Sequence, residues 1–185
     1  DCILPTEPPL ADGAAFDPQT RTWRIIAEAP VPFAWAVSAL IGRTAYFWIP
    51  GQPGRSGAAP AFLAYEIDAD RWHELQLPPG DMQQSGIVAA GDRIVAFSGT
   101  DELGELPDLI FDPTVGRWTD LVADPLSPSF DRSMAWSGRE LILFDHELVA
   151  NPGSERPSLV RAAALNLATG TWRRLPDSEV LGGPW

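Results

Sequence analysis

Short apolar runs separated by polar turns recur along the chain, and three segments share one form. Each begins with a short apolar run, continues through a glycine and one or two polar residues, and ends in a second, more strongly apolar run. These segments are 36–48, 85–97 and 132–144. Two apolar runs joined by a tight glycine-containing turn predict a β-hairpin. We therefore expect a hairpin in each of the three segments.

A second segment occurs four times, at 14–23, 64–72, 110–118 and 164–172. In each copy an apolar residue precedes Asp, Glu or Asn, and Trp follows six positions after that polar residue. A side-chain oxygen at the turn start bonds the backbone ahead, so each copy predicts a hairpin with Trp early on its returning strand. Because these polar positions recur, we predict that they form turns and do not bind ligands. The residues assigned to this structural repeat are Asp17, Trp23, Glu66, Trp72, Asp112, Trp118, Asn166 and Trp172.

The two kinds of hairpin alternate, and one of each supplies four strands. Successive repeat Trp residues are 49, 46 and 54 positions apart, and a period of about 50 residues is typical of β-propellers, whose blades are four-stranded sheets. The predicted fold is all-β: a β-propeller of four-stranded antiparallel blades that forms an incomplete ring in this chain. We expect the indole of each repeat Trp to lie between neighbouring sheets. The predicted parts of this single partial domain (1–185) are a half blade at 13–27, blades at 33–76, 84–122 and 131–175, and entry into a next blade at 176–185.

The repeated hairpin resembles that of the kelch-repeat β-propellers, and the resemblance covers nearly the whole chain. The aromatic residue of the kelch third strand matches Phe16, Tyr65 and Phe111, whereas Leu165 stands in the last copy. The kelch double glycine is absent, so the pattern is divergent. The Asp-box hairpin of sialidase-type propellers also runs from Asp through Gly to Trp. The Asp-Pro-x-Thr form and the added Gly-Arg hairpins favour kelch.

The strand count corresponds to roughly three and a half blades, whereas propellers close with about four to eight. Open sheet edges favour aggregation. We therefore expect the ring to be completed by remaining propeller blades or by a second chain.

Charge and cysteine content exclude several kinds of partner and site. The formal net charge is −12, with an isoelectric point near 4.4, which argues against nucleic acid and anionic membrane surfaces as partners. The single cysteine, Cys2, excludes an internal disulfide and zinc sites built on cysteine clusters. No apolar run approaches the length of a membrane span, so no membrane insertion is expected. A composition rich in Ala, Pro, Arg and Trp without Lys indicates a GC-rich bacterial source, and we expect a soluble, extracytoplasmic or secreted protein.

The resemblance places the long irregular segments on one face. These are the loops 50–60, 99–107 and 146–158 and the blade connections 28–33, 77–84 and 123–131. Function concentrates on variable loops held by a rigid frame, so we expect the binding face there. Its candidate residues are Trp35, Gln84, Asp131 and Arg132 at the starts of innermost strands, and Arg55, Glu102, His146, Glu147 and Arg156 on the loops.

Catalytic chemistry has few candidates in the sequence. With two histidines and one cysteine, only Asp145, His146 and Glu147 form a local cluster of the residue types that metals or acid–base catalysis require. We predict no catalytic residue, no metal and no cofactor. The favoured function is non-catalytic binding of a protein or glycan partner through the long-loop face. The alternatives are a glycan-acting hydrolase, lyase or epimerase completed by further blades, with Arg132 as its best-placed arginine, and a purely structural role.

Overall fold

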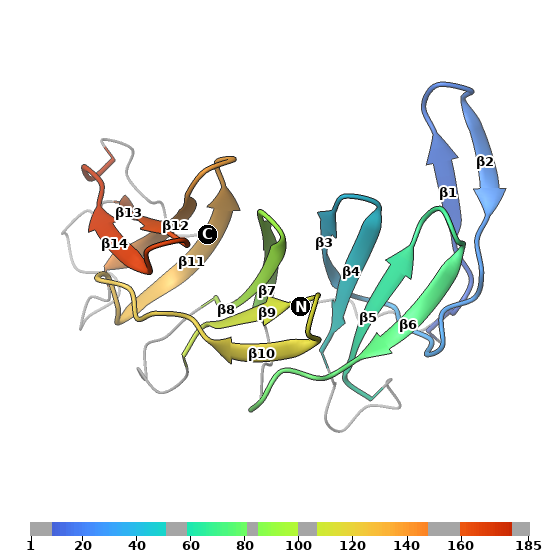
Figure 1. Ribbon diagram of the computed structural model, residues 1–185, viewed down its shortest axis with the longest axis horizontal. Coiled ribbons are helices and arrows are strands. Elements are labelled where there is room, and N and C mark those ends of the chain that lie inside the picture. Colours follow the sequence, from blue (N-terminus) through green and yellow to red (C-terminus); the bar gives the residue numbers. More distant parts are fainter. Residues whose placement is uncertain (1–8, 51–58, 81–84, 100–106, 148–159, 179–185) are drawn as a thin grey trace, which may run out of the picture. The chain divides into compact units, whose positions relative to one another are not determined.

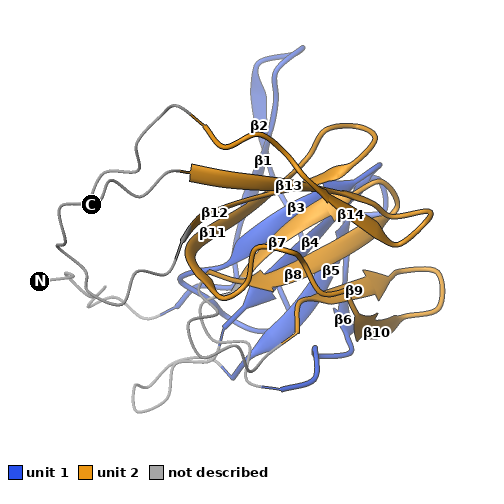
Figure 2. Cartoon of the chain, turned by 90° about the vertical axis from the view of Figure 1, so that its left-hand side faces the viewer, with its two compact units in different colours: residues 1–83 blue, residues 84–185 orange. Residues whose placement is uncertain are grey.

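The structure is a computed structural model that describes residues 9–50, 59–80, 85–99, 107–147 and 160–178 (Figure 1). The strands of these residues form one two-stranded hairpin and three four-stranded antiparallel sheets. The predicted all-β fold with four-stranded antiparallel sheets is therefore confirmed. The chain divides into two compact units, Asp1–Gln83 and Gln84–Trp185 (Figure 2).

Each sheet is a meander in which strands that follow one another along the chain are paired. The first unit contains β1 (Ala14–Asp17), β2 (Thr22–Ile25), β3 (Val37–Ile41), β4 (Thr44–Ile49), β5 (Ala61–Glu66) and β6 (Arg71–Leu75). One sheet of the second unit contains β7 (Ser85–Ala90), β8 (Arg93–Ser98), β9 (Leu109–Asp112) and β10 (Arg117–Asp120). The other contains β11 (Ser129–Trp136), β12 (Leu141–Glu147), β13 (Val160–Asn166) and β14 (Thr171–Arg174). The predicted assignment of these sheets to blades of a single domain stays a prediction.

In the repeated hairpin, the polar residue at the end of the first strand closes the turn. Asp17 Oδ1 accepts a hydrogen bond from the backbone N–H of Gln19 at 2.8 Å. The equivalent acceptors are Asp112, bonded to Thr114 N–H at 2.8 Å, and Asn166, bonded to Ala168 N–H at 3.0 Å. Their predicted role as turn formers is confirmed, because a short side chain can reach the backbone two residues ahead.

The second copy departs from this pattern. The longer Glu66 instead pairs across the turn with Arg71 and His73, each at 2.9 Å. The position two residues before each repeat Trp has a positive φ in all four copies. It is occupied by Arg21 (56°), Asp70 (50°), Gly116 (66°) and Gly170 (64°). Only the two glycines adopt this left-handed conformation without steric cost.

The repeat Trp residues join neighbouring hairpins. The indole N–H of Trp72 donates to the carbonyl of Ala27 at 2.8 Å, and that of Trp172 donates to the carbonyl of Val122 at 2.9 Å. Ala27 and Val122 each lie in the segment that follows the preceding copy of the hairpin. In these two copies the indole therefore reaches the chain that follows the preceding hairpin, while the predicted position of the Trp between blades stays a prediction.

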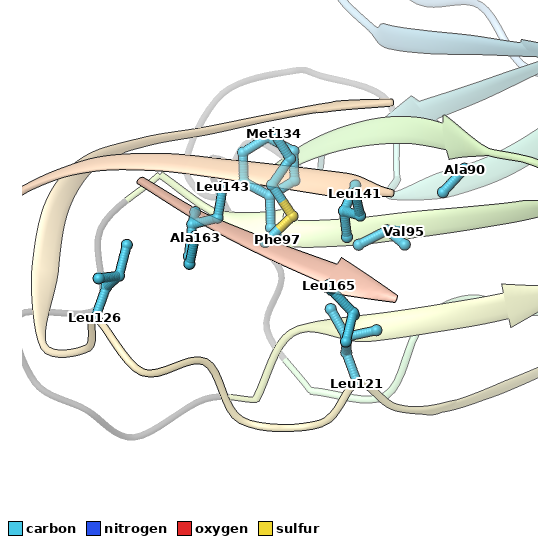
Figure 3. Packing of buried hydrophobic residues seen from close by; sticks show 10 residues of the cluster. All are labelled: Ala90, Val95, Phe97, Leu121, Leu126, Met134, Leu141, Leu143, Ala163 and Leu165. Carbon is cyan, nitrogen blue, oxygen red and sulfur yellow. The ribbon is translucent and has the colours of Figure 1, made fainter. Parts of the chain in front are cut away.

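The second unit has an apolar core between its two sheets. Figure 3 shows ten buried side chains of this cluster from β7, β8, β11, β12, β13 and the connection after β10. Phe97 packs directly over Gly86, where an added Cβ would lie 2.5 Å from the ring. Burial of these side chains stabilises the unit through the hydrophobic effect, and it positions the strand ends on which the candidate site is built.

Candidate functional site

Antiparallel pairing places the long connections of each sheet at one end and its tight turns at the other. In the sheet β3–β6, for example, the pairs Val37–Trp48 and Ile49–Ala61 place the long β4–β5 segment at the end where β3 starts. The tight turns after β3 and β5 lie at the opposite end. The same order holds in the other two sheets. We call the end with the long connections the long-loop end.

A buried arginine joins the two sheets of the second unit at this end. The side chain of Arg132, from β11, is 2% exposed. Its Nη1 and Nη2 donate to the two carboxylate oxygens of Asp108 at 3.0 and 2.8 Å, and Nη2 also donates to Asp124 at 3.0 Å. The backbone N–H of Arg132 donates to the carbonyl of Gly99 at 2.8 Å. The paired geometry with Asp108 is the strong form of an arginine–carboxylate contact.

Asp124 extends this contact into the connection between β10 and β11. Its carboxylate accepts hydrogen bonds from the backbone N–H groups of Leu126 at 2.7 Å and Ser127 at 2.9 Å. The Ser127 hydroxyl donates to it as well, at 2.8 Å. One carboxylate therefore fixes the shape of the connection and ties it to Arg132.

A second buried pair lies beside the first. Arg161, at the start of β13, donates from Nε to Asp145 at 2.9 Å and from Nη2 to the carbonyl of Leu126 at 2.8 Å. Asp145 is almost fully buried. Because Leu126 belongs to the connection that Asp124 holds, the two pairs form one unit. We call it the ionic cluster, made of Asp108, Asp124, Arg132, Asp145 and Arg161.

The ionic cluster contains three carboxylates and two guanidinium groups. Burial raises the pKa of the Asp108 carboxyl, against the opposing effect of its hydrogen bonds with Arg132. Burial likewise raises the pKa of Asp145, against the hydrogen bond from Arg161, and the negative charge of Asp124 adds to both increases. Buried ions are tolerated only where partners replace the lost water. The cluster therefore holds the loop bases in one arrangement.

A bulge in β11 shifts the alternation of buried and exposed residues, so that Arg132, and not Asp131, is buried like Ser129. The β11–β12 register shifts between Phe130 and Ser133, and Asp131 has a φ of 49°. Bulges re-aim side chains and are frequent beside functional sites. Here Arg132 enters the ionic cluster, whereas the side chain of Asp131 is more than half exposed.

Asp131 lies next to a histidine at the long-loop end. Its carboxylate is 3.5 Å from Nδ1 of His146, whose side chain is largely buried. The His146 ring meets Phe130 edge-on, with centroids 5.5 Å apart. An exposed carboxylate and a largely buried imidazole therefore lie side by side at the long-loop end of the second unit.

The structure therefore brings together two of the predicted site residues, Asp131 and His146, and places a third, Arg132, in the ionic cluster. Glu147 is the last residue of β12, directly after His146. Trp35 lies in the first unit, two residues before β3, and is 66% exposed. The predicted residues Arg55, Gln84, Glu102 and Arg156 lie outside the described residues.

Sequence reasoning missed Asp108, Asp124 and Arg161. One signal was present in the sequence: Arg132 and Met134 are two residues apart in a predicted strand, so they lie on the same face. Both are buried in the structure, and the arginine therefore faces the core. A charge at such a position requires buried partners. The identity of those partners was hidden, because Asp108 and Asp124 lie 24 and 8 residues away from Arg132.

Two other features are absent from the described residues. No group of three or more His, Cys, Asp or Glu side chains among them is placed to hold a metal ion. The same residues contain no helix with the length and apolar character needed to cross a membrane.

Comparison with known proteins supports the fold. No family model and no curated protein matches the chain. Among solved structures, that of YjhT superimposes with a TM-score of 0.60 at 16% sequence identity. The match covers 94% of this chain and 67% of that one. At this identity the likeness concerns the arrangement of the strands alone.

Proposed function

We propose that the chain forms blades of a kelch-like β-propeller. The support is the repetition: each four-stranded meander ends in a hairpin with an early Trp. In two copies the indole reaches the segment following the preceding hairpin. The likeness in fold to YjhT agrees with this arrangement.

We further propose that the long-loop end binds a protein or glycan partner without chemical conversion. The observation that carries this proposal is the ionic cluster beneath that end. It fixes the bases of several connections, and the adjacent bulge leaves Asp131 exposed beside His146. A rigid frame with polar groups on its rim suits recognition, because little conformational entropy is lost on binding.

The chemistry at the rim agrees with either class of partner. The Asp131 carboxylate can accept hydrogen bonds from sugar hydroxyls or from basic side chains. The imidazole of His146 adds a second polar contact 3.5 Å away. The net charge of −12 favours a neutral or basic partner over an acidic one.

The test compares the two ends of one sheet. A photo-reactive residue is introduced at Asp131, at the long-loop end, or at the exposed Thr169, in the turn between β13 and β14, and the protein is incubated with candidate proteins. Glycan binding is measured in parallel on an array with Asp131→Ala and Thr169→Ala. We expect crosslinks from position 131 alone, or a loss of glycan binding of about tenfold or more in Asp131→Ala alone. Equal behaviour of the two positions would contradict the proposal.

The enzymatic alternative, a glycan-acting hydrolase, lyase or epimerase, stays a prediction. Arg132, the arginine best placed for that role by sequence, has its guanidinium engaged with Asp108 and Asp124. The binding proposal is therefore the one we develop.

A further inference from the structure

The indole contacts follow a fixed spacing along the chain. Ala27, the acceptor for Trp72, lies four residues after Trp23, and Val122, the acceptor for Trp172, lies four residues after Trp118. Each contact thus joins the Trp of one hairpin to the fourth residue after the Trp of the preceding hairpin. The repeat therefore has a donor half, the Trp, and an acceptor half, the segment that follows it.

The acceptor half has the same backbone arrangement in the first and last copies. Ile26 N–H bonds back to Gly13 at 3.1 Å, and Ala29 N–H bonds to Ala11 at 2.8 Å. In the last copy, the equivalent bonds from Leu175 to Ala162 and from Ser178 to Val160 are 2.8 and 2.9 Å. Pro176 is thereby held where Ala27 stands in the first copy.

The donor half of the first hairpin is exposed. Trp23 is 70% exposed, Phe16 is 48% exposed, and Ile25 is exposed too. The rings of Phe16 and Trp23 lie 5.1 Å apart at 44°, nearly the geometry of the buried pair Phe111–Trp118 at 5.0 Å and 43°. The aromatic face of hairpin β1–β2, drawn in blue in Figure 1, is therefore already in its packed arrangement.

A second feature matches the donor half of the first hairpin to the acceptor half of the last copy. Where Trp72 contacts Ala27, the N–H of Ala27 also donates to Asp70, two residues before Trp72, at 3.0 Å. The hairpin of Trp23 carries Arg21 at the position of Asp70 and has no carboxylate there. Pro176 has no N–H to donate. Segment 175–178 has no N–H at Pro176, and the Trp23 hairpin has no carboxylate at position 21. Neither side of the contact therefore leaves the other without its hydrogen-bond partner.

Charge does not oppose the match. Arg173 stands at the position of Arg24, which pairs with Asp70 in the first unit. Arg173 is paired with Glu140 of its own sheet at 2.8 Å. Its charge is therefore compensated when it faces Arg21.

We propose that the aromatic face of hairpin β1–β2 docks on segment 175–178 of a second copy of this chain. In this contact the Trp23 indole N–H donates to the carbonyl of Pro176. The interface is head-to-tail, because a donor half of one copy meets an acceptor half of another. Segment 175–178 lies at the long-loop end of its own sheet, because Ser178 bonds to Val160 at the start of β13. The contact is made by residues other than Asp131 and His146, so its test does not depend on the partner proposed above.

The first experiment measures self-association of the 185-residue chain by sedimentation velocity across a wide concentration range. We expect the wild type to associate, and Trp23→Ala to weaken the association about thirtyfold, the effect of losing a central interface Trp. Trp23→Phe, which keeps an aromatic ring but removes the N–H, is expected to fall between them. The control is Leu40→Ala, because the Leu40 side chain is also exposed but lies in β3, outside the repeated hairpin. This control should associate like the wild type.

The second experiment identifies the contact. A photo-reactive residue at position 23 is activated in a mixture of isotopically light and heavy chains. Crosslinks from position 23 to segment 175–178 between light and heavy chains are the expected result. A wild type that stays monomeric, a Trp23→Ala variant that associates normally, or crosslinks within one chain or to another segment would each overturn the proposal.

Discussion

Hairpins β1–β2 and β9–β10 are the same local structure in two surroundings. Both begin with an Asp that closes the turn through a 2.8 Å bond to the backbone two residues ahead. Both place Phe and Trp rings about 5 Å apart. Yet Trp23 is 70% exposed, whereas Trp118 is 7% exposed. The hairpin shape therefore follows from local interactions, while the stabilisation its aromatic rings supply depends on the neighbouring sheet.

The largest expected difference is between the two tryptophans themselves. Trp118→Ala should lower the free energy of unfolding by about 3–5 kcal/mol, because it leaves a cavity in a packed sheet. Trp23→Ala should lower it by less than about 1 kcal/mol in the monomer, because the side chain already contacts water. Urea denaturation of both variants, monitored at low protein concentration, measures the two values. Equal losses would mean that the surroundings do not decide the contribution of the Trp.

The second comparison sets a buried arginine against an exposed one. Arg132→Met removes the partner of Asp108 and Asp124 and should cost about 3 kcal/mol, since it leaves two carboxylates buried without their cation. Arg173→Met breaks a more exposed pair with Glu140 and should cost less than about 1 kcal/mol. Chemical denaturation of both variants tests this. A small loss in the free energy of unfolding for Arg132→Met would contradict the claim that the ionic cluster holds the loop bases.

The third comparison exchanges residues at the positive-φ position of the two hairpins. Arg21→Gly should stabilise the first hairpin by about 0.5–1 kcal/mol, because glycine adopts this conformation without steric cost. Gly116→Ala should destabilise the second unit by about 1 kcal/mol for the same reason. Thermal unfolding of both variants gives the sign of each change. Effects of the same sign would show that the backbone conformation does not control them.

The smallest expected effects concern pH. Hydrogen bonds from the backbone of Gln19 hold the pKa of Asp17 below 3.8, and those from Thr114 do the same for Asp112. These groups contribute stability above pH 3.8 that is lost as the pH falls through their lower folded pKa values. Burial raises the pKa of Asp108, so its contribution is present below pH 3.8 and is lost as the pH rises through the folded value.

NMR titration of the side-chain carboxyl groups measures these three pKa values directly. The pKa values of Asp17 and Asp112 should both lie below 3.8, although one hairpin is exposed and the other is packed, because hydrogen bonds within the turn are the largest cause in each. Asp108 should titrate above both. An Asp112 pKa at or above 3.8 would contradict the assignment of its turn hydrogen bonds.

The candidate site was only partly accessible to sequence reasoning. Asp131, Arg132 and His146 were among the predicted site residues; Asp131 and His146 lie 3.5 Å apart, whereas Arg132 pairs with Asp108 and Asp124. Their roles diverge because adjacent side chains of a strand point to opposite faces, and the bulge at Asp131 makes Arg132 the buried one of the two. Strict alternation along a strand predicts no such bulge, since it arises from the pairing of β11 with β12.

What the sequence determined by itself is the set of hairpins and their turns. Asp17 and Asp112 bond backbone groups two residues ahead, and Gly116 and Gly170 adopt a positive φ. These interactions span a few residues, so the local pattern is sufficient to specify them. The repeat of that pattern then specifies four-stranded antiparallel sheets.

Only the tertiary structure decided which copies are buried and which charges meet. Arg132 is 24 residues from Asp108 in sequence, and Trp172 is 50 residues from Val122. Such contacts depend on how whole sheets pack, and burial then determines how much each contact contributes. The same Phe–Trp hairpin is exposed in one place and part of a core in another because hydrophobic stabilisation comes from the neighbouring surface and not from the hairpin alone.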